Sequence, residues 1–159
     1  MAKGPIGKLD HIGIAVKSIA EARKFYEAEL GATFIYEHAN EEEGFKFAEF
    51  DLGGTVIELL ESTRDDSFLH KFIEQRGEGV HHLTFGVPNC RERVAELKAA
   101  GVRMVDETEH SPDSYEAFVS PRSSHGVLMQ LGSGYPTLVL DPEWENAVPG
   151  LRLNKFRTK

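Results

Sequence analysis

The sequence predicts an α+β fold in which two similar βαβββ modules form a cupped mixed β-sheet. The main observation is an internal repeat. The stretch "DHIGIAVKSIAEARKFYEAELGATF" at 10–34 and the stretch "HHLTFGVPNCRERVAELKAAGVRMV" at 81–105 both run from strand-like alternation into helical periodicity. Each helical stretch then reaches a glycine, Gly31 or Gly101, where a helix C-terminus is expected. Three further strand-like runs follow in each half.

Each of these runs is predicted to form a β-strand. In the first half they are "ATFIYEH", "FKFAEFDL" and "TVIELLE", and in the second "VRMVDE", "YEAFVS" and "GVLMQLG". Ser18 and Asn89 are the expected N-caps of the two main helices, because a glutamate follows each by three residues. We therefore predict a first module at 8–61, a linker with a short helix at 62–79, a second module at 80–132 and an extended tail at 133–159.

Composition excludes several classes of function. A hydrophobic content of 40% and a charged content of 28% are typical of a globular protein. There is no apolar run of about 20 residues and no apolar signal segment, so we expect no membrane span and a cytoplasmic protein. The net charge of −8 argues against nucleic-acid binding. The single cysteine, Cys90, excludes an intramolecular disulfide and is expected at a helix start rather than as a nucleophile.

The paired histidines in "VHHLTF" cannot both face one site, because neighbouring strand residues point to opposite faces of a sheet. His82 shares a face with small residues, as His11 does in the equivalent strand of the first half. His81 corresponds to Asp10 and is expected to point towards the helix side. We therefore pair His82 with His11 and assign His81 a packing or supporting position.

Polar residues also recur in the last strand of each half, where Glu58 in "VIELL" is equivalent to Gln130 in "LMQLG". A single strand histidine is more often a structural residue, and a buried carboxylate is costly unless it is paired or metal-bound. Four polar residues at symmetric positions, His11, Glu58, His82 and Gln130, instead favour a metal site. We expect one divalent ion per chain, with Co, Ni, Mn, Mg, Zn and Fe all left open.

These features resemble the vicinal oxygen chelate superfamily, which comprises glyoxalase, bleomycin-resistance and dioxygenase proteins, and are closest to methylmalonyl-CoA epimerase. The matching segments, within residues 8 to 132, are "DHIGIAVKSIAEARKFYEAELG", "NEEEGF", "IELLEST", "DSFLHKFIEQRGEGVHHLTFGV" and "GVLMQL". The resemblance implies paired βαβββ modules around a divalent metal held by His11, Glu58, His82 and Gln130, and a homodimer. The family usually has glutamate where this chain has Gln130, whose amide oxygen can bind a metal but cannot act as a base.

The resemblance implies a metal-dependent isomerase that removes the proton α to a thioester through a metal-stabilised enolate. The substrate would be a small molecule, such as an acyl-CoA. Glu58 is one candidate base and Glu49 the second, although an exposed edge carboxylate is the alternative for Glu49. Arg122 is a candidate for binding a substrate carboxylate or phosphate, or else lies in a surface turn. The loop "HSPDSYEAF" differs from that of the epimerases and leaves the substrate open.

Three other functions remain open at this point. A glyoxalase I-like lyase would use the same ligands, and two histidines with one carboxylate also form the ligand triad of iron-dependent dioxygenases. A non-catalytic small-molecule binding or resistance protein is the third. The retention of His11, Glu58 and His82 argues against this last function, whereas Gln130 in place of glutamate keeps it open.

Overall fold

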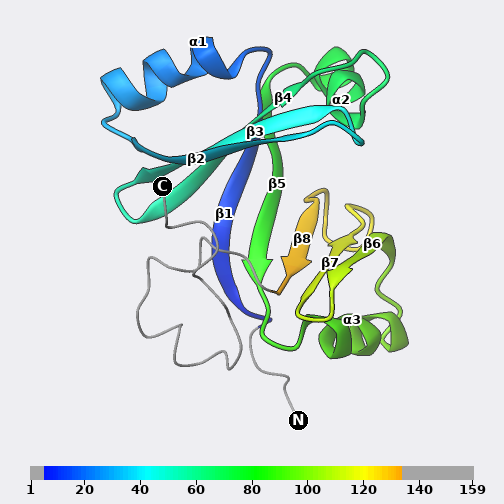
Figure 1. Cartoon of the computed structure of the whole chain (residues 1–159). Helices are drawn as coiled ribbons and strands as arrows, with labels where there is room; N and C mark the ends of the chain where they lie inside the picture. Colours follow the sequence, from blue (N-terminus) through cyan, green and yellow to red (C-terminus); the bar gives the residue numbers. More distant parts are fainter. Residues whose placement is uncertain (1–5, 134–159) are drawn as a thin grey trace. The chain divides into compact units, whose positions relative to one another are not determined.

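The computed structural model describes residues 6–133 (Figure 1). Residues 134–159, which make up nearly all of the predicted tail, lie outside the described residues. The described chain forms two compact units, one of which is His11–His82, and the boundaries fall inside the first and fifth strands. Strands and helices follow each other in the predicted order. The module boundaries at 8–61, 62–79 and 80–132 stay a prediction.

The unit His11–His82 contains a mixed arrangement of strands in the order β2-β3-β4-β1. The inner strand β4 pairs in parallel with β1, whereas β3 is antiparallel to both β2 and β4. The bounds of these strands are β1 (Lys8–Ala15), β2 (Thr33–Asn40), β3 (Phe45–Leu52) and β4 (Thr55–Ser62).

The other unit repeats this pattern, with the strand order β5-β8-β7-β6. Here β5 pairs in parallel with β8, and β7 is antiparallel to both β8 and β6. The bounds are β5 (Gly79–Gly86), β6 (Met104–Ser111), β7 (Ser114–Val119) and β8 (Met129–Gly132). The equivalent pairings confirm the predicted mixed α+β fold and its internal repeat.

The helices are α1 (Ile19–Arg23), α2 (Phe68–Arg76) and α3 (Cys90–Ala99), with a π-helix η1 (Lys24–Glu29) continuing α1. Ser18 caps α1 as predicted, because its Oγ accepts a hydrogen bond of 3.3 Å from the backbone N–H of Glu21. The continuation differs from the regular helix expected, since the N–H of Leu30 donates to the carbonyl of Phe25, five residues back. The predicted side-chain cap at Asn89 does not form.

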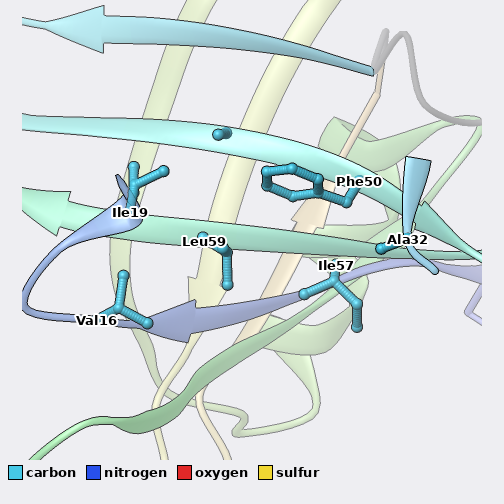
Figure 2. Packing of buried hydrophobic residues seen from close by; sticks show 7 residues of the cluster. Val16, Ile19, Ala32, Phe50, Ile57 and Leu59 are labelled. Atoms are coloured by element: carbon cyan, nitrogen blue, oxygen red, sulfur yellow. The ribbon is translucent and has the colours of Figure 1, made fainter. Parts of the chain in front are cut away.

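The core of the first unit packs α1 against one face of its strands. Figure 2 shows its buried side chains along these strands. This face carries alternate residues of β4, Ile57 and Leu59, as the period of two requires. Its buried members are Val16, Ile19, Ala32, Ala48, Phe50, Ile57 and Leu59. The next residue along β4, Leu60, packs instead with Leu69 of α2. Because β4 is buried on both faces, Glu58 lies between apolar neighbours on the face that α2 helps to cover.

Candidate metal centre

Three buried side chains of the first unit, His11, Glu58 and His82, bring their donor atoms within 4.8 Å of one another. Nε2 of His11 lies 2.7 Å from Oε2 of Glu58. The imidazole rings of His11 and His82 meet edge to face, with their centroids 5.7 Å apart. Two imidazole nitrogens and a carboxylate oxygen therefore converge, as the sequence predicts for these three residues.

Strand register explains why His11 and Glu58 meet. In the parallel pair of β1 and β4, Gly13 lies opposite Glu58 and His11 lies opposite Val56. Residues two apart on a strand share a face, so His11 and Gly13 point to the same side as Glu58. Residues 11, 13 and 58 therefore line one face at neighbouring positions.

Gly13 has a role at this site that the sequence does not reveal. A β-carbon at position 13 would lie 2.3 Å from Cε1 of His82 and 2.7 Å from its Nε2. No side chain fits at such a distance, so the missing side chain of Gly13 makes room for the His82 ring. The only sequence signal is that small residues share the histidine face of this strand.

His81 supports the ring of His82 from the side. Nδ1 of His81 lies 2.9 Å from Nδ1 of His82, which is hydrogen-bonding distance. The His81 ring also packs against two aromatic residues of α2, with centroid distances of 4.8 Å to Phe72 and 5.5 Å to Phe68. His81 thus contacts a helix, although this is α2, which precedes its strand, and it also makes a polar contact with His82.

The pKa shifts of His82 and Glu58 suit metal binding. Burial lowers the pKa of His82 to about 3 and that of His81 to about 4, although the charge of Glu58 opposes both shifts. Burial alone would raise the pKa of Glu58, but the charge of His11 and the hydrogen bond with it lower that pKa overall. At neutral pH the rings of His81 and His82 are therefore neutral and Glu58 is ionised. Neutral imidazole and carboxylate are the forms that bind metal ions.

Glu49 of β3 is buried, with 3% of its surface exposed, so the alternative of an exposed edge carboxylate is wrong. The physical reason is that β3 lies between β2 and β4, so that Glu49 is opposite Glu58 in the antiparallel register and opposite Tyr36 on the other side. Directly opposite residues point to the same face. The hydroxyl of Tyr36, which sequence reasoning missed, donates a 3.3 Å hydrogen bond to Oε1 of Glu49. Two carboxylates therefore share one buried face.

Gln130 lies in the other unit, on β8, and is buried. Its Oε1 accepts a 2.8 Å hydrogen bond from the hydroxyl of Thr84, and its Nε2 donates a 3.0 Å hydrogen bond to Oε2 of Glu116. Nε2 of His110 lies 3.1 Å from the other oxygen of Glu116. The sequence does not point to Glu116. Thr84 could have been identified from the sequence as a neighbour of the site, because it lies two residues after His82 on the same strand face.

The two remaining candidates have different surroundings. Arg122 is exposed in the turn between β7 and β8, where its backbone N–H donates to the hydroxyl of Ser120 at 3.3 Å. Cys90 is buried at the start of α3, and burial raises the pKa of its thiol to about 12. A thiol that stays protonated is not a nucleophile, which agrees with a structural role for Cys90.

The chain is similar to known proteins of one superfamily. The profile of the Glyoxalase/Bleomycin resistance protein/Dioxygenase superfamily matches residues 10–118. The chain is 40% identical over 129 residues to the uncharacterized protein YqjC of Bacillus subtilis, covering 79% of this chain and 91% of that protein. It is 32% identical over 130 residues to mitochondrial methylmalonyl-CoA epimerase of Dictyostelium discoideum, covering 79% and 78% of the two chains.

Among solved structures, a variant of Streptomyces coelicolor methylmalonyl-CoA epimerase in complex with 2-nitronate-propionyl-CoA superposes with a TM-score of 0.71. The two sequences are 34% identical, and the match covers 80% of this chain and 97% of the other. Within residues 6–133, no helix is both long and apolar enough to cross a membrane.

Proposed function

The chain belongs to the Glyoxalase/Bleomycin resistance protein/Dioxygenase superfamily, and from that premise we propose that it is a metal-dependent isomerase of the methylmalonyl-CoA epimerase type. Relatives of assigned activity are epimerases, which confirms the expectation of an enzyme. The observation that carries the finer proposal is the pair of carboxylates, Glu49 and Glu58, on the buried face that also holds the two histidines.

The donor set fits a divalent ion. Two imidazoles and one carboxylate suit Zn, Co, Ni, Mn or Fe, with water or substrate oxygens at the remaining positions. We propose one ion per chain, held by His11, Glu58 and His82. Gln130 is proposed as the fourth ligand, because its amide oxygen has a second lone pair beside the one that Thr84 uses. Once bound, the ion would supply a Lewis acid for the negative charge that develops on a substrate oxygen.

The proton transfers fall to the two carboxylates. Epimerisation requires that one group removes the proton α to the thioester and that another returns a proton on the opposite face. Glu58 contacts His11 at 2.7 Å and belongs to the proposed ligand set, so its role as a base competes with metal binding. Glu49 is not one of the three clustered donors, and Tyr36 can hold its carboxylate in place. We therefore propose Glu49 as the principal base and Glu58 as its partner in proton transfer.

The proposed substrate is an acyl-CoA, because the superposing epimerase structure contains a propionyl-CoA derivative. Its negatively charged groups need a local cation, since the net charge of the chain is −8. Arg122, exposed in its turn, is proposed for that contact. A homodimer is proposed on the family resemblance. A cytoplasmic location is proposed on the composition, because a single cysteine suits a reducing compartment.

The test is exchange of the α-proton with solvent. The full chain, loaded with Co²⁺ and incubated with a single epimer of methylmalonyl-CoA in deuterated water, should incorporate deuterium and produce the other epimer. Mass spectrometry and NMR measure both results, and chelator-treated protein is the control. If the loaded protein shows neither exchange nor inversion, the epimerase proposal fails.

A second candidate is an iron-dependent dioxygenase, favoured by the same observation of two histidines and one carboxylate. Oxygen uptake with a catechol by the Fe²⁺-loaded protein would support it. Metal binding without turnover of any of these substrates, including the glyoxalase substrate, would instead favour a binding protein.

A further inference from the structure

The adjacent histidines of β5 form a polar contact that the proposed metal set does not use. Nδ1 of His81 and Nδ1 of His82 lie 2.9 Å apart. A hydrogen bond at this distance requires one ring to carry the proton on Nδ1 and the other to accept it. The two rings therefore have linked tautomers, and the tautomer of His82 decides which of its nitrogens can bind a metal ion.

Both rings are constrained by packing. Phe72 and Phe68 of α2 contact the His81 ring edge to face or tilted, at centroid distances of 4.8 and 5.5 Å. The His82 ring occupies the space above Gly13, where a β-carbon would come within 2.3 Å of it. The planes of the His81 and His82 rings are perpendicular, at 90°. Neither ring can turn away without losing these contacts, so the contact between the two Nδ1 atoms is part of the packed structure.

Two proton arrangements are compatible with this contact. If His81 donates, His82 accepts at Nδ1, and its own proton lies on Nε2, which then has no lone pair for a metal ion. If His82 donates from Nδ1, its Nε2 has the lone pair. Only the second arrangement lets His82 join His11 and Glu58 as a ligand.

On the basis of the proposed metal site, we infer that His81 is a positioning residue, which accepts a hydrogen bond from Nδ1–H of His82. This hydrogen bond leaves the lone pair of Nε2 of His82 available to the metal ion. Metal-binding histidines generally donate their other ring N–H to an acceptor, which fixes the tautomer and increases the basicity of the ligand. In most proteins this acceptor is a carboxylate, a backbone carbonyl or water. Here it is the neutral imidazole of the neighbouring residue in the same strand.

The inference has a spectroscopic test that is independent of activity. In ¹⁵N-labelled full chain loaded with Zn²⁺, Nδ1 of His82 should have the chemical shift of a protonated nitrogen and Nδ1 of His81 that of an unprotonated one. A scalar coupling between these two nitrogens should be visible across the hydrogen bond. A proton on Nδ1 of His81, or Zn²⁺ on Nδ1 of His82, overturns the inference.

Variants provide the second test. His81→Phe keeps the aromatic packing but removes the acceptor, and should weaken Zn²⁺ binding about 10- to 100-fold in a chelator competition. His81→Asn returns an acceptor at the Nδ1 position and should restore most of the affinity. His70→Phe, a histidine on α2 with 34% of its side chain exposed, is the matched control and should bind as the wild type does.

The outcomes separate this inference from the proposed function. If wild-type protein does not bind Zn²⁺, the proposed metal site fails and the inference fails with it. If wild-type protein and His81→Phe bind Zn²⁺ equally well, only the inference fails. If His81→Phe does not fold, as judged by circular dichroism, the coupling in the wild type and the affinity of His81→Asn still decide the question.

Discussion

Gly13 of β1 lies directly beneath the imidazole of His82, and a β-carbon at position 13 would come within 2.3 Å of Cε1 in that ring. This glycine is not needed for a left-handed backbone conformation, since it is not among the glycines with positive φ. It is needed for space. The position of the His82 ring on β5 thus depends on the absence of a side chain at position 13 of β1.

We predict that Gly13→Ala displaces the His82 ring and lowers metal content. The overpacking should reduce the free energy of unfolding by about 1–3 kcal/mol, measured by urea denaturation. The matched experiment is a double-mutant cycle with His82→Ala. Once the imidazole is gone, the added methyl group has room, so Gly13→Ala should cost much less in that background. Equal costs in both backgrounds would contradict the steric explanation.

We predict that removing one of the proposed ligands empties the proposed metal site. Purified wild-type protein should contain about one divalent ion per chain, and His82→Ala or Glu58→Ala should lose most of it, because only two of the three clustered donors remain. Elemental analysis after dialysis measures this. His38→Ala, which removes an exposed histidine from β2, is the control. Unchanged metal content in His82→Ala would mean that the ion is held elsewhere.

The alternation of side chains between the two faces of a strand explains which parts of the fold and of the candidate site could be predicted from the sequence. Alternation assigned His11 and His82 to equivalent faces, and the repeat paired Glu58 with Gln130. These deductions need only the order of residues along a strand. The convergence of His11 and Glu58 follows from that alternation once β1 and β4 are neighbours.

The features that sequence reasoning missed depend on register between strands. The burial of Glu49 follows from the inner position of β3, and its hydrogen bond from Tyr36 follows from the pairing of β2 with β3. Neither pairing can be read from one strand alone. The π-helical continuation of α1 was also missed, since apolar spacing does not distinguish hydrogen bonds to the fourth and fifth preceding residues.

We predict that Glu49→Gln abolishes epimerisation while leaving metal content unchanged. Loss of a positioned general base should reduce kcat by about 10²- to 10⁴-fold, whereas the ligands stay in place. In a mechanism with two bases, the variant should still exchange the α-proton of one epimer through Glu58 without inverting it. Glu37→Gln, an exposed carboxylate on β2, is the matched control. Normal turnover by Glu49→Gln would remove Glu49 from the mechanism.

We predict that Gln130→Glu is destabilising because of Glu116. The substitution replaces a donor by a carboxylate oxygen about where Nε2 now lies, 3.0 Å from Oε2 of Glu116. Loss of the hydrogen bond and repulsion between like charges should lower the free energy of unfolding by about 1–3 kcal/mol at neutral pH. Adding Glu116→Gln should restore it, because a donor again faces an acceptor.

The same double variant tests Gln130 as a ligand. If position 130 binds the ion, a carboxylate there should bind Zn²⁺ more tightly than the amide does, and Gln130→Glu with Glu116→Gln should exceed the wild type in affinity. The variant Glu116→Gln alone is the control for the change at position 116. An affinity that does not respond to the residue at position 130 would exclude Gln130 from the ligand set.

We predict that Cys90 is chemically inert in the folded protein. Burial raises the pKa of its thiol from 9.0 to about 12, so almost no thiolate exists at pH 8. A thiol reagent such as Ellman's reagent should therefore react only as fast as the chain unfolds, and urea should accelerate the reaction. The folded protein keeps the thiol proton to a higher pH than the unfolded chain does. The contribution of this group to the free energy of unfolding is therefore fully present below the unfolded pKa of the thiol. That contribution is lost as the pH rises from about 9 to about 12, at about 1.4 kcal/mol per pH unit.

Cys90→Ala should remove this alkaline dependence and leave turnover unchanged, since the side chain packs with Val87 and Val94 rather than with the proposed ligands. Some stability should be lost at neutral pH, because a buried sulfur is replaced by a smaller group. Fast labelling of the native protein, or loss of activity in Cys90→Ala at unchanged stability, would show that the thiol takes part in the chemistry. Slow labelling that follows unfolding assigns it to the packing of α3 alone.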